Sequence, residues 1–169
     1  MQALKVWLHR LEEVTVAVAM SIAVLLSFVE VVLRKFFGES LGFTHELVVY
    51  LLIYAGLIGA AIGVREKVHL GVDLLVKQFS PAVQKAIVIG TTVVSIAFTV
   101  IITMLGIEHV LNMQAFGQVT PELEIPLYIP LLMVPLSFAL MALHFINEMV
   151  QIIRTDKEKI FQTEGGTTE

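Results

Sequence analysis

The sequence contains no cysteine, one tryptophan and few charged residues. Without cysteine the chain can form no disulfide, thiolate metal site or redox dithiol, which excludes the four-helix membrane proteins that make disulfides with a quinone. Charged residues are 15% of the 169 positions, whereas a soluble domain carries about 25%. Hydrophobic residues are 57%, and the mean hydropathy is +0.86. This composition predicts an integral membrane protein.

Four long stretches without charge predict an all-α membrane protein with four transmembrane helices. A helix needs about 20 apolar residues to cross a hydrocarbon core of about 30 Å. One transmembrane domain is expected at residues 1–154, and the polar residues 155–169 predict a disordered tail. The expected spans are residues 14–35, 46–64, 82–107 and 126–149.

The positive charges predict the orientation of the spans. Nine of the eleven lysines and arginines lie before the first span, within residues 65–85, or after the fourth span. On the opposite side only Arg34 and Lys35 occur, at the end of the first span. Because cytoplasmic loops carry the excess of lysine and arginine, both termini are expected in the cytoplasm. Residues 3–11 and 66–79 mix apolar and charged side chains, and we expect them along the membrane surface.

The first span carries Glu30, and Arg34 follows four residues later on the same helix face. A carboxylate in a membrane span is unfavourable unless it is paired. We therefore expect an ion pair between Glu30 and Arg34, which is either structural, at a contact between subunits, or in direct contact with a solute. Glu46 opens the second span, where a carboxylate interacts favourably with the helix dipole.

The second span contains a face of small residues and leads into a polar face. Gly56, Gly59 and Gly63 would let another helix approach closely. The polar residues that follow recur every four positions, and they are Arg65, His69 and Asp73. They could bridge to one another or bind the phosphate of a phospholipid, or they could belong to an ordinary basic loop.

The segment between the third and fourth spans is the most specific local sequence. Its Thr120-Pro121 step favours an extended turn, because proline restricts the residue before it. Pro126 suits the start of the fourth helix, and Pro135 predicts a kink within it. By itself this segment predicts a structured return into the membrane.

Three groups of residues, in order along the chain, carry a resemblance to a known family. They are Glu30 and Arg34; His45-Glu46, Gly56, Arg65, His69 and Asp73; and Gly117, Thr120-Pro121, Leu123, Ile125-Pro126 and Pro130. Over most of residues 10–150 the chain resembles the small membrane subunit of tripartite ATP-independent periplasmic (TRAP) transporters. That family often has a tryptophan and paired acids before the second span, whereas this chain has Phe43-Thr44-His45-Glu46.

The resemblance implies an accessory subunit of a sodium-coupled secondary transporter in the bacterial inner membrane, and not an enzyme. Its partners would be a large membrane subunit in roughly equimolar amount, a periplasmic binding protein and phospholipid, with no nucleic acid. The binding protein would deliver an organic acid of the C4-dicarboxylate or sialic-acid type. Sodium would bind the large subunit, so this chain would need no cofactor. The outer residues expected to help dock the binding protein are Gly117, Thr120, Pro121, Glu122, Glu124 and Pro126.

Two other functions remain open from the residues alone. One is a small homodimeric exporter driven by protons, which would use Glu30 in the membrane. The other is a haem-binding electron-transfer subunit, which would need paired histidines. The positions of His45, His69 and His109 at or beyond the ends of their spans count against haem.

Overall fold

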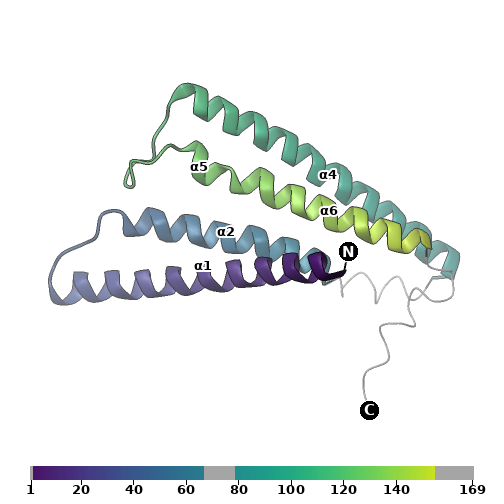
Figure 1. Cartoon of the computed structure of the whole chain (residues 1–169), viewed down its shortest axis with the longest axis horizontal. Coiled ribbons are helices and arrows are strands. Elements are labelled where there is room, and N and C mark those ends of the chain that lie inside the picture. Colours follow the sequence, from purple (N-terminus) through teal and green to yellow (C-terminus); the bar gives the residue numbers. More distant parts are fainter. Residues whose placement is uncertain (1, 67–78, 155–169) are drawn as a thin grey trace, which may run out of the picture.

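The computed structural model describes residues 2–66 and 79–154, which are helical apart from short connections (Figure 1). The described residues contain no strand, which confirms the all-α class, and an isolated bridge pairs Val119 with Pro126. The helices are α1 (Gln2–Phe36), α2 (Thr44–Arg65), α4 (Pro81–Phe116), α5 (Tyr128–Leu131) and α6 (Met133–Arg154).

Four helical stretches are long and apolar enough to cross a membrane, as the sequence predicts. They are His9–Phe36, Thr44–Arg65, Val83–Phe116 and Tyr128–Ile153. The third is longer than expected, because α4 continues through Glu108 to Phe116 and has 36 residues. A helix of that length measures about 54 Å, which exceeds a hydrocarbon core of about 30 Å. This helix therefore either extends beyond the core or is strongly tilted.

Residues 3–11, which we expect along the membrane surface, form the first part of α1. Residues 3–11 continue into the first span without a break, because residues 2–36 contain neither proline nor glycine. The helix ends at Phe36, shortly before Gly38 adopts a left-handed φ of 70°. Most of the second expected surface segment and the whole expected tail lie outside the described residues.

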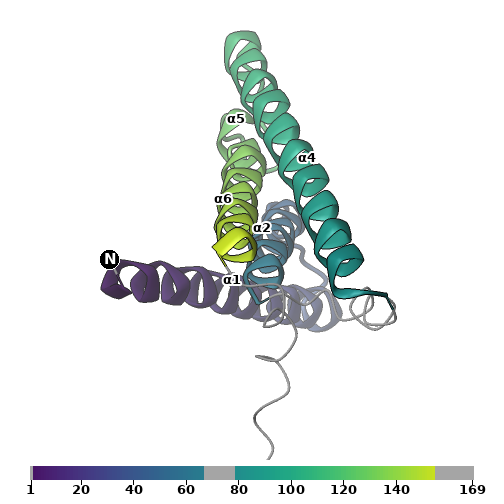
Figure 2. The same ribbon diagram turned by 90° about the vertical axis from the view of Figure 1, so that its right-hand side faces the viewer.

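The long helices form two antiparallel hairpins (Figure 1). One hairpin consists of α1 and α2, and the other of α4 with α5 and α6. Their tight connections, residues 37–43 and 117–127, lie at what we call the tip end, on the left of Figure 1. The N-terminus and the far ends of α2 and α6 lie at the opposite, terminal end. Figure 1 shows α6 between α2 and α4, and it packs against both. In Figure 2, which looks from the terminal end, α1 lies below α2 and α6.

The buried core lies where α6 meets α2 and α4. Ala61 of α2 packs with Met141 and Phe145 of α6, and Ile96 and Phe138 pack against this cluster. The small side chain of Ala61 is fully buried, so the backbone of α2 comes close to the larger side chains of α6. Close packing of small against large residues is how helices associate in lipid, where apolar contacts gain little from the hydrophobic effect.

Helices α4 and α6 fit together at a glycine and a proline. Pro135 cannot donate a backbone hydrogen bond to Leu131, and the helix is interrupted at Leu132, between α5 and α6. The proline ring packs against Gly106 of α4, where an added Cβ atom would lie 3.3 Å from the Cβ and Cδ atoms of Pro135. A side chain at position 106 would therefore push the two helices apart.

We expect Gly106→Leu to lower the free energy of unfolding by about 1–3 kcal/mol, because the new side chain overpacks the contact with Pro135. Gly90→Leu is the matched control on the same helix, since Gly90 is exposed with open space around it. The measurement is a denaturant titration in detergent micelles. Equal midpoints for the two variants would show that the Gly106 contact does not limit packing.

Candidate functional site

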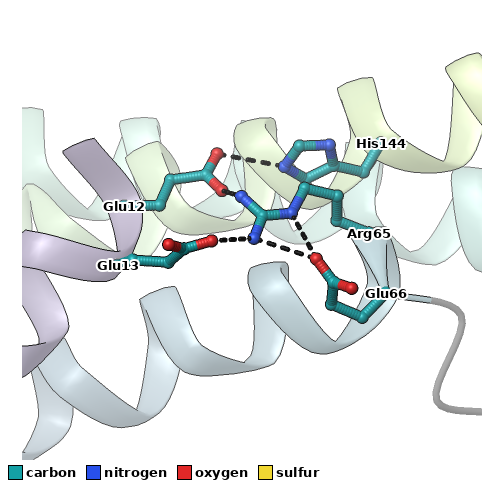
Figure 3. A network of polar contacts seen from close by, with 5 residues as sticks. All are labelled: Glu12, Glu13, Arg65, Glu66 and His144. Carbon is teal, nitrogen blue, oxygen red and sulfur yellow. Dashed lines mark hydrogen bonds and ion pairs between the residues drawn. The ribbon is translucent and has the colours of Figure 1, made fainter. Parts of the chain in front are cut away.

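Arg65, the last residue of α2, lies in a network of charged side chains at the terminal end (Figure 3). Its guanidinium forms ion pairs with Glu12 at 2.8 Å, Glu13 at 2.6 Å and Glu66 at 3.0 Å. The Nε2 atom of His144 lies 3.1 Å from the other carboxylate oxygen of Glu12. The network thus joins α1, α2 and α6.

The centre of this network is buried. The side chains of Arg65, Glu12 and His144 are 9%, 8% and 12% exposed. A buried carboxylate is unfavourable unless it is paired and hydrogen-bonded, and each oxygen of Glu12 has a partner. Glu13 and Glu66 are more than half exposed, so their pairs with Arg65 contribute less.

The sequence predicts that Arg65 shares a polar helix face with His69 and Asp73. His69 and Asp73 lie outside the described residues. Arg65 itself faces three carboxylates rather than a phospholipid phosphate. The signal that could have revealed this pairing is Glu12-Glu13 directly before a long apolar run, since carboxylates at the start of a span need a cation nearby.

A second polar contact joins the hairpins at the tip end. One carboxylate oxygen of Glu46 accepts hydrogen bonds from the backbone N–H groups of Glu122 at 2.8 Å and Leu123 at 2.9 Å. In return, the Glu122 carboxylate accepts the backbone N–H of Glu46 at 3.0 Å, in the first turn of α2. The Tyr50 hydroxyl donates to the other oxygen of Glu46 at 2.9 Å. Each carboxylate therefore satisfies backbone donors of the other segment, and we call this arrangement the Glu46–Glu122 contact.

The connection that carries Glu122 is also held by its own backbone. Gly117 ends α4 with a left-handed φ of 61°, a conformation that favours glycine. Thr120 is buried, and its backbone N–H donates to the carbonyl of Ile125 at 2.8 Å. Thr120 thus supports the connection from within, and its expected part in docking stays a prediction. The residues of the expected docking surface that are exposed are Gly117, Pro121, Glu122, Glu124 and Pro126.

A cavity of about 440 Å³ lies beside this contact, between α1, α2 and the connection at residues 117–127. The carboxylate of Glu30 accepts the Ser40 hydroxyl at 2.5 Å and the Leu41 N–H at 3.1 Å. Arg34 also lines the cavity, but it forms no ion pair or hydrogen bond with another described residue. Glu30 and Arg34 therefore form no direct ion pair, and only the longer-range attraction of their charges joins them, because the turn after α1 brings other donors onto Glu30.

The small-residue face of α2 is open within this chain. A Cβ atom added at Gly56, Gly59 or Gly63 would meet nothing within 4 Å. The described helices therefore do not use this face for their own packing. Its expected role as the meeting place with a helix of another subunit stays a prediction.

The histidines do not form a metal site in the described part of the chain. His45 lies in the first turn of α2 and His109 towards the C-terminal end of α4, and both are exposed. His144 contacts Glu12 at the terminal end, where its ring centroid lies 6.3 Å from that of His9. No group of three or more metal-ligating side chains occurs in residues 2–66 and 79–154.

We expect Glu12→Gln to destabilise the chain by about 1–3 kcal/mol, because Arg65 and His144 lose a buried charged partner. Glu13→Gln, the same change at the adjacent exposed carboxylate, should lower stability by less than about 1 kcal/mol. Denaturant titration of both variants in micelles measures the difference. A larger effect of Glu13→Gln would contradict the assignment of the buried centre to Glu12.

The Glu46–Glu122 contact makes a separate prediction. Glu46→Ala should speed hydrogen exchange at the amides of Glu122 and Leu123, which lose their acceptor. Tyr50→Phe removes a single donor to Glu46 and should leave these two amides protected. Hydrogen exchange read by mass spectrometry tests both variants. Unchanged protection in Glu46→Ala would mean that the connection is held by its own backbone alone.

Comparison with known proteins assigns this chain to a family. The family model of the tripartite ATP-independent periplasmic transporters, DctQ component, matches residues 23–155. The chain is 30% identical over 118 residues to the C4-dicarboxylate TRAP transporter small permease protein DctQ of Rhodobacter capsulatus, covering 70% of this chain and 52% of that protein. The protein of the same name from Vibrio cholerae is 27% identical over 92 residues, or 54% of this chain and 40% of the relative.

A third relative is a longer protein. The isethionate TRAP transporter permease protein DctMQ of Oleidesulfovibrio alaskensis is 25% identical over 114 residues, which is 66% of this chain and 18% of that protein. The chain thus spans about half the length of the Rhodobacter relative and less of the other two. On the family match over most of its length, the chain belongs to the DctQ component family of TRAP transporters, and it is a multi-pass membrane component of a transporter rather than an enzyme.

Proposed function

We propose that this chain is the small membrane subunit of a sodium-coupled TRAP transporter that imports an organic acid. It would lie in the bacterial inner membrane with the terminal end in the cytoplasm, as the distribution of lysine and arginine favours. The observation that carries the proposal is the family match over residues 23–155. Sodium and the solute would bind the large membrane subunit.

The distribution of polar groups supports a scaffold rather than a carrier. In the described residues, the charged networks lie at the terminal end around Arg65 and at the tip end around Glu46. Between them the hydroxyls of Thr92, Thr99 and Thr103 donate to carbonyls of their own helix. The middle of the bundle therefore offers little that could replace the hydration shell of an anion or of sodium.

The exposed apolar surface supports a large membrane partner. In each of the first three spans, only 11% of the most apolar 18-residue stretch is buried within the chain. In the fourth span the share is 33%. The outer faces of α1, α2 and α4 therefore need lipid or protein against them. The open glycine face of α2 is where we place a helix of the large subunit, since small residues allow close backbone approach.

The tip end would meet the periplasmic binding protein. Its exposed carboxylates are Glu39, Glu108, Glu122 and Glu124. The Glu46–Glu122 contact fixes the connection at residues 117–127 against α2, so its exposed residues form a held surface rather than a loose loop. An acidic surface of this kind favours a partner with a basic patch, and it accelerates association most at low salt.

The names of the relatives support a class of solute. Two of them are named for C4-dicarboxylates and one for isethionate, so all three names describe small organic anions. We propose a C4-dicarboxylate as the first solute to test, and a sialic-acid type as the second.

The two other functions are less well supported. An exporter driven by protons would need a carboxylate available in the span, whereas Glu30 is hydrogen-bonded to Ser40 and Leu41 near the tip end. A haem would need facing histidines deep in the bundle, and the described histidines lie towards its two ends. Neither function accounts for the family match.

The test is co-purification of the tagged chain from its native membrane in a mild detergent. We expect a large polytopic membrane protein in roughly equimolar amount. Gly56→Leu should reduce its recovery, because the new side chain fills the open face of α2, while Gly90→Leu on exposed α4 should not. Recovery of the chain as a homodimer without such a partner would overturn the proposal. Normal recovery with Gly56→Leu would move the interface to another face and leave the subunit assignment standing.

A further inference from the structure

The cavity at the tip end has features that the transport role does not explain. Its volume of about 440 Å³ lies in the range of small-molecule sites, which is about 300–1,000 Å³. Ser27, Val31 and Arg34 come from α1, and Thr44 and Val48 from α2. Polar and apolar side chains therefore line the same cavity, near the ends of two membrane spans.

Thr44 is the most informative residue of this cavity. It is only 2% exposed, and its hydroxyl forms no close hydrogen bond, although it interacts with the nearby Glu30 carboxylate. A buried hydroxyl without a well-formed hydrogen bond is unfavourable. Because Thr44 lines the cavity, a polar atom of a bound molecule would satisfy its hydroxyl.

Both positively and negatively charged side chains line the cavity. Arg34 is exposed and has no hydrogen bond or close ion pair with the described residues. Its charge interacts with Glu30 at longer range, and its guanidinium N–H groups can still bind an anion. Glu122 uses one carboxylate oxygen for the N–H of Glu46, and its Oε1 atom has no partner among the described residues. Glu30 adds a second carboxylate to the same wall. A molecule that carries one positive and one negative group would complement this arrangement.

We propose that this cavity binds the headgroup of an aminophospholipid, with the phosphate against Arg34 and the Thr44 hydroxyl and the ammonium group against the free oxygen of Glu122. Arg34 lies half a turn from the end of the span His9–Phe36, where the headgroup layer begins. Val24 and Phe28, towards the middle of the same helix, are 61% and 67% exposed. The acyl chains would lie along this apolar surface of α1. The site does not depend on the proposed transport role, because its residues all belong to this chain.

The test uses the full chain with whatever membrane proteins co-purify with it. The sample is exchanged into micelles that contain phosphatidylethanolamine and phosphatidylglycerol in equal amounts, with identical acyl chains. Native mass spectrometry then counts the lipids retained after detergent removal. We expect the amine-bearing lipid to be retained about tenfold over the glycerol lipid, since its ammonium gains a charge-assisted hydrogen bond.

Arg34→Gln should reduce the retained phosphatidylethanolamine by about tenfold. Lys35→Gln removes the same charge one residue further along and outside the cavity, and it should leave retention unchanged. Thr44→Val should reduce retention several-fold while changing the melting temperature of the lipid-free sample little, because its hydroxyl forms no close hydrogen bond within the chain. A purely structural role of Thr44 would instead lower the melting temperature.

Three results would overturn the proposal. Equal retention of phosphatidylglycerol would show that the ammonium group does not contact Glu122. Displacement of the lipid by millimolar inorganic phosphate would identify a soluble anion as the ligand. Protection of Arg34 from chemical labelling by a co-purified protein, with no lipid retained, would identify the cavity as a protein contact.

Discussion

The buried ion pair between Arg65 and Glu12 is the interaction on which the arrangement of the helices depends. It joins the start of α1 to the end of α2, and His144 brings α6 into the same network. In lipid the helices gain little from burying apolar surface against one another, so polar contacts have a larger share in deciding which helices meet. Leaving either buried charge without its partner is unfavourable, so other arrangements of the three helices are disfavoured.

The Glu46–Glu122 contact has the same role at the other end, by a different mechanism. The carboxylates there accept backbone N–H groups rather than pairing with cations, so each stabilises the first turn or the connection of the other hairpin. Between the two ends, the helices pack through small residues and the fit of Pro135 against Gly106. The bundle is thus polar at its two ends and apolar between them, and only a small part of its apolar surface is covered from within.

This arrangement suits a membrane protein whose surface contacts lipid and other subunits. The carboxyl groups that would be unfavourable in lipid are all near the ends of the helices, and most of them have a hydrogen-bond partner in the described part of the chain. Arg34 and the Thr44 hydroxyl form no close hydrogen bond there and line one cavity, while the glycine face of α2 is open to a neighbouring helix. These are the places where lipid and partner subunits can act without disturbing the internal contacts.

The sequence by itself determined the membrane class, the four spans and the family resemblance, because each depends on local properties: apolar run length, charge-free stretches and the order of short motifs. It also pointed to Glu46 at the start of a helix. Only the tertiary structure decided the partners of the charged residues. Arg65 pairs with Glu12, 53 positions away, and Glu46 binds the backbone 76 positions away, whereas the neighbours Glu30 and Arg34 form no direct ion pair. Helical spacing shows which side chains share a face, but a turn or a second helix can offer a carboxylate better donors than its own helix does, and those contacts exist only after the chain has folded.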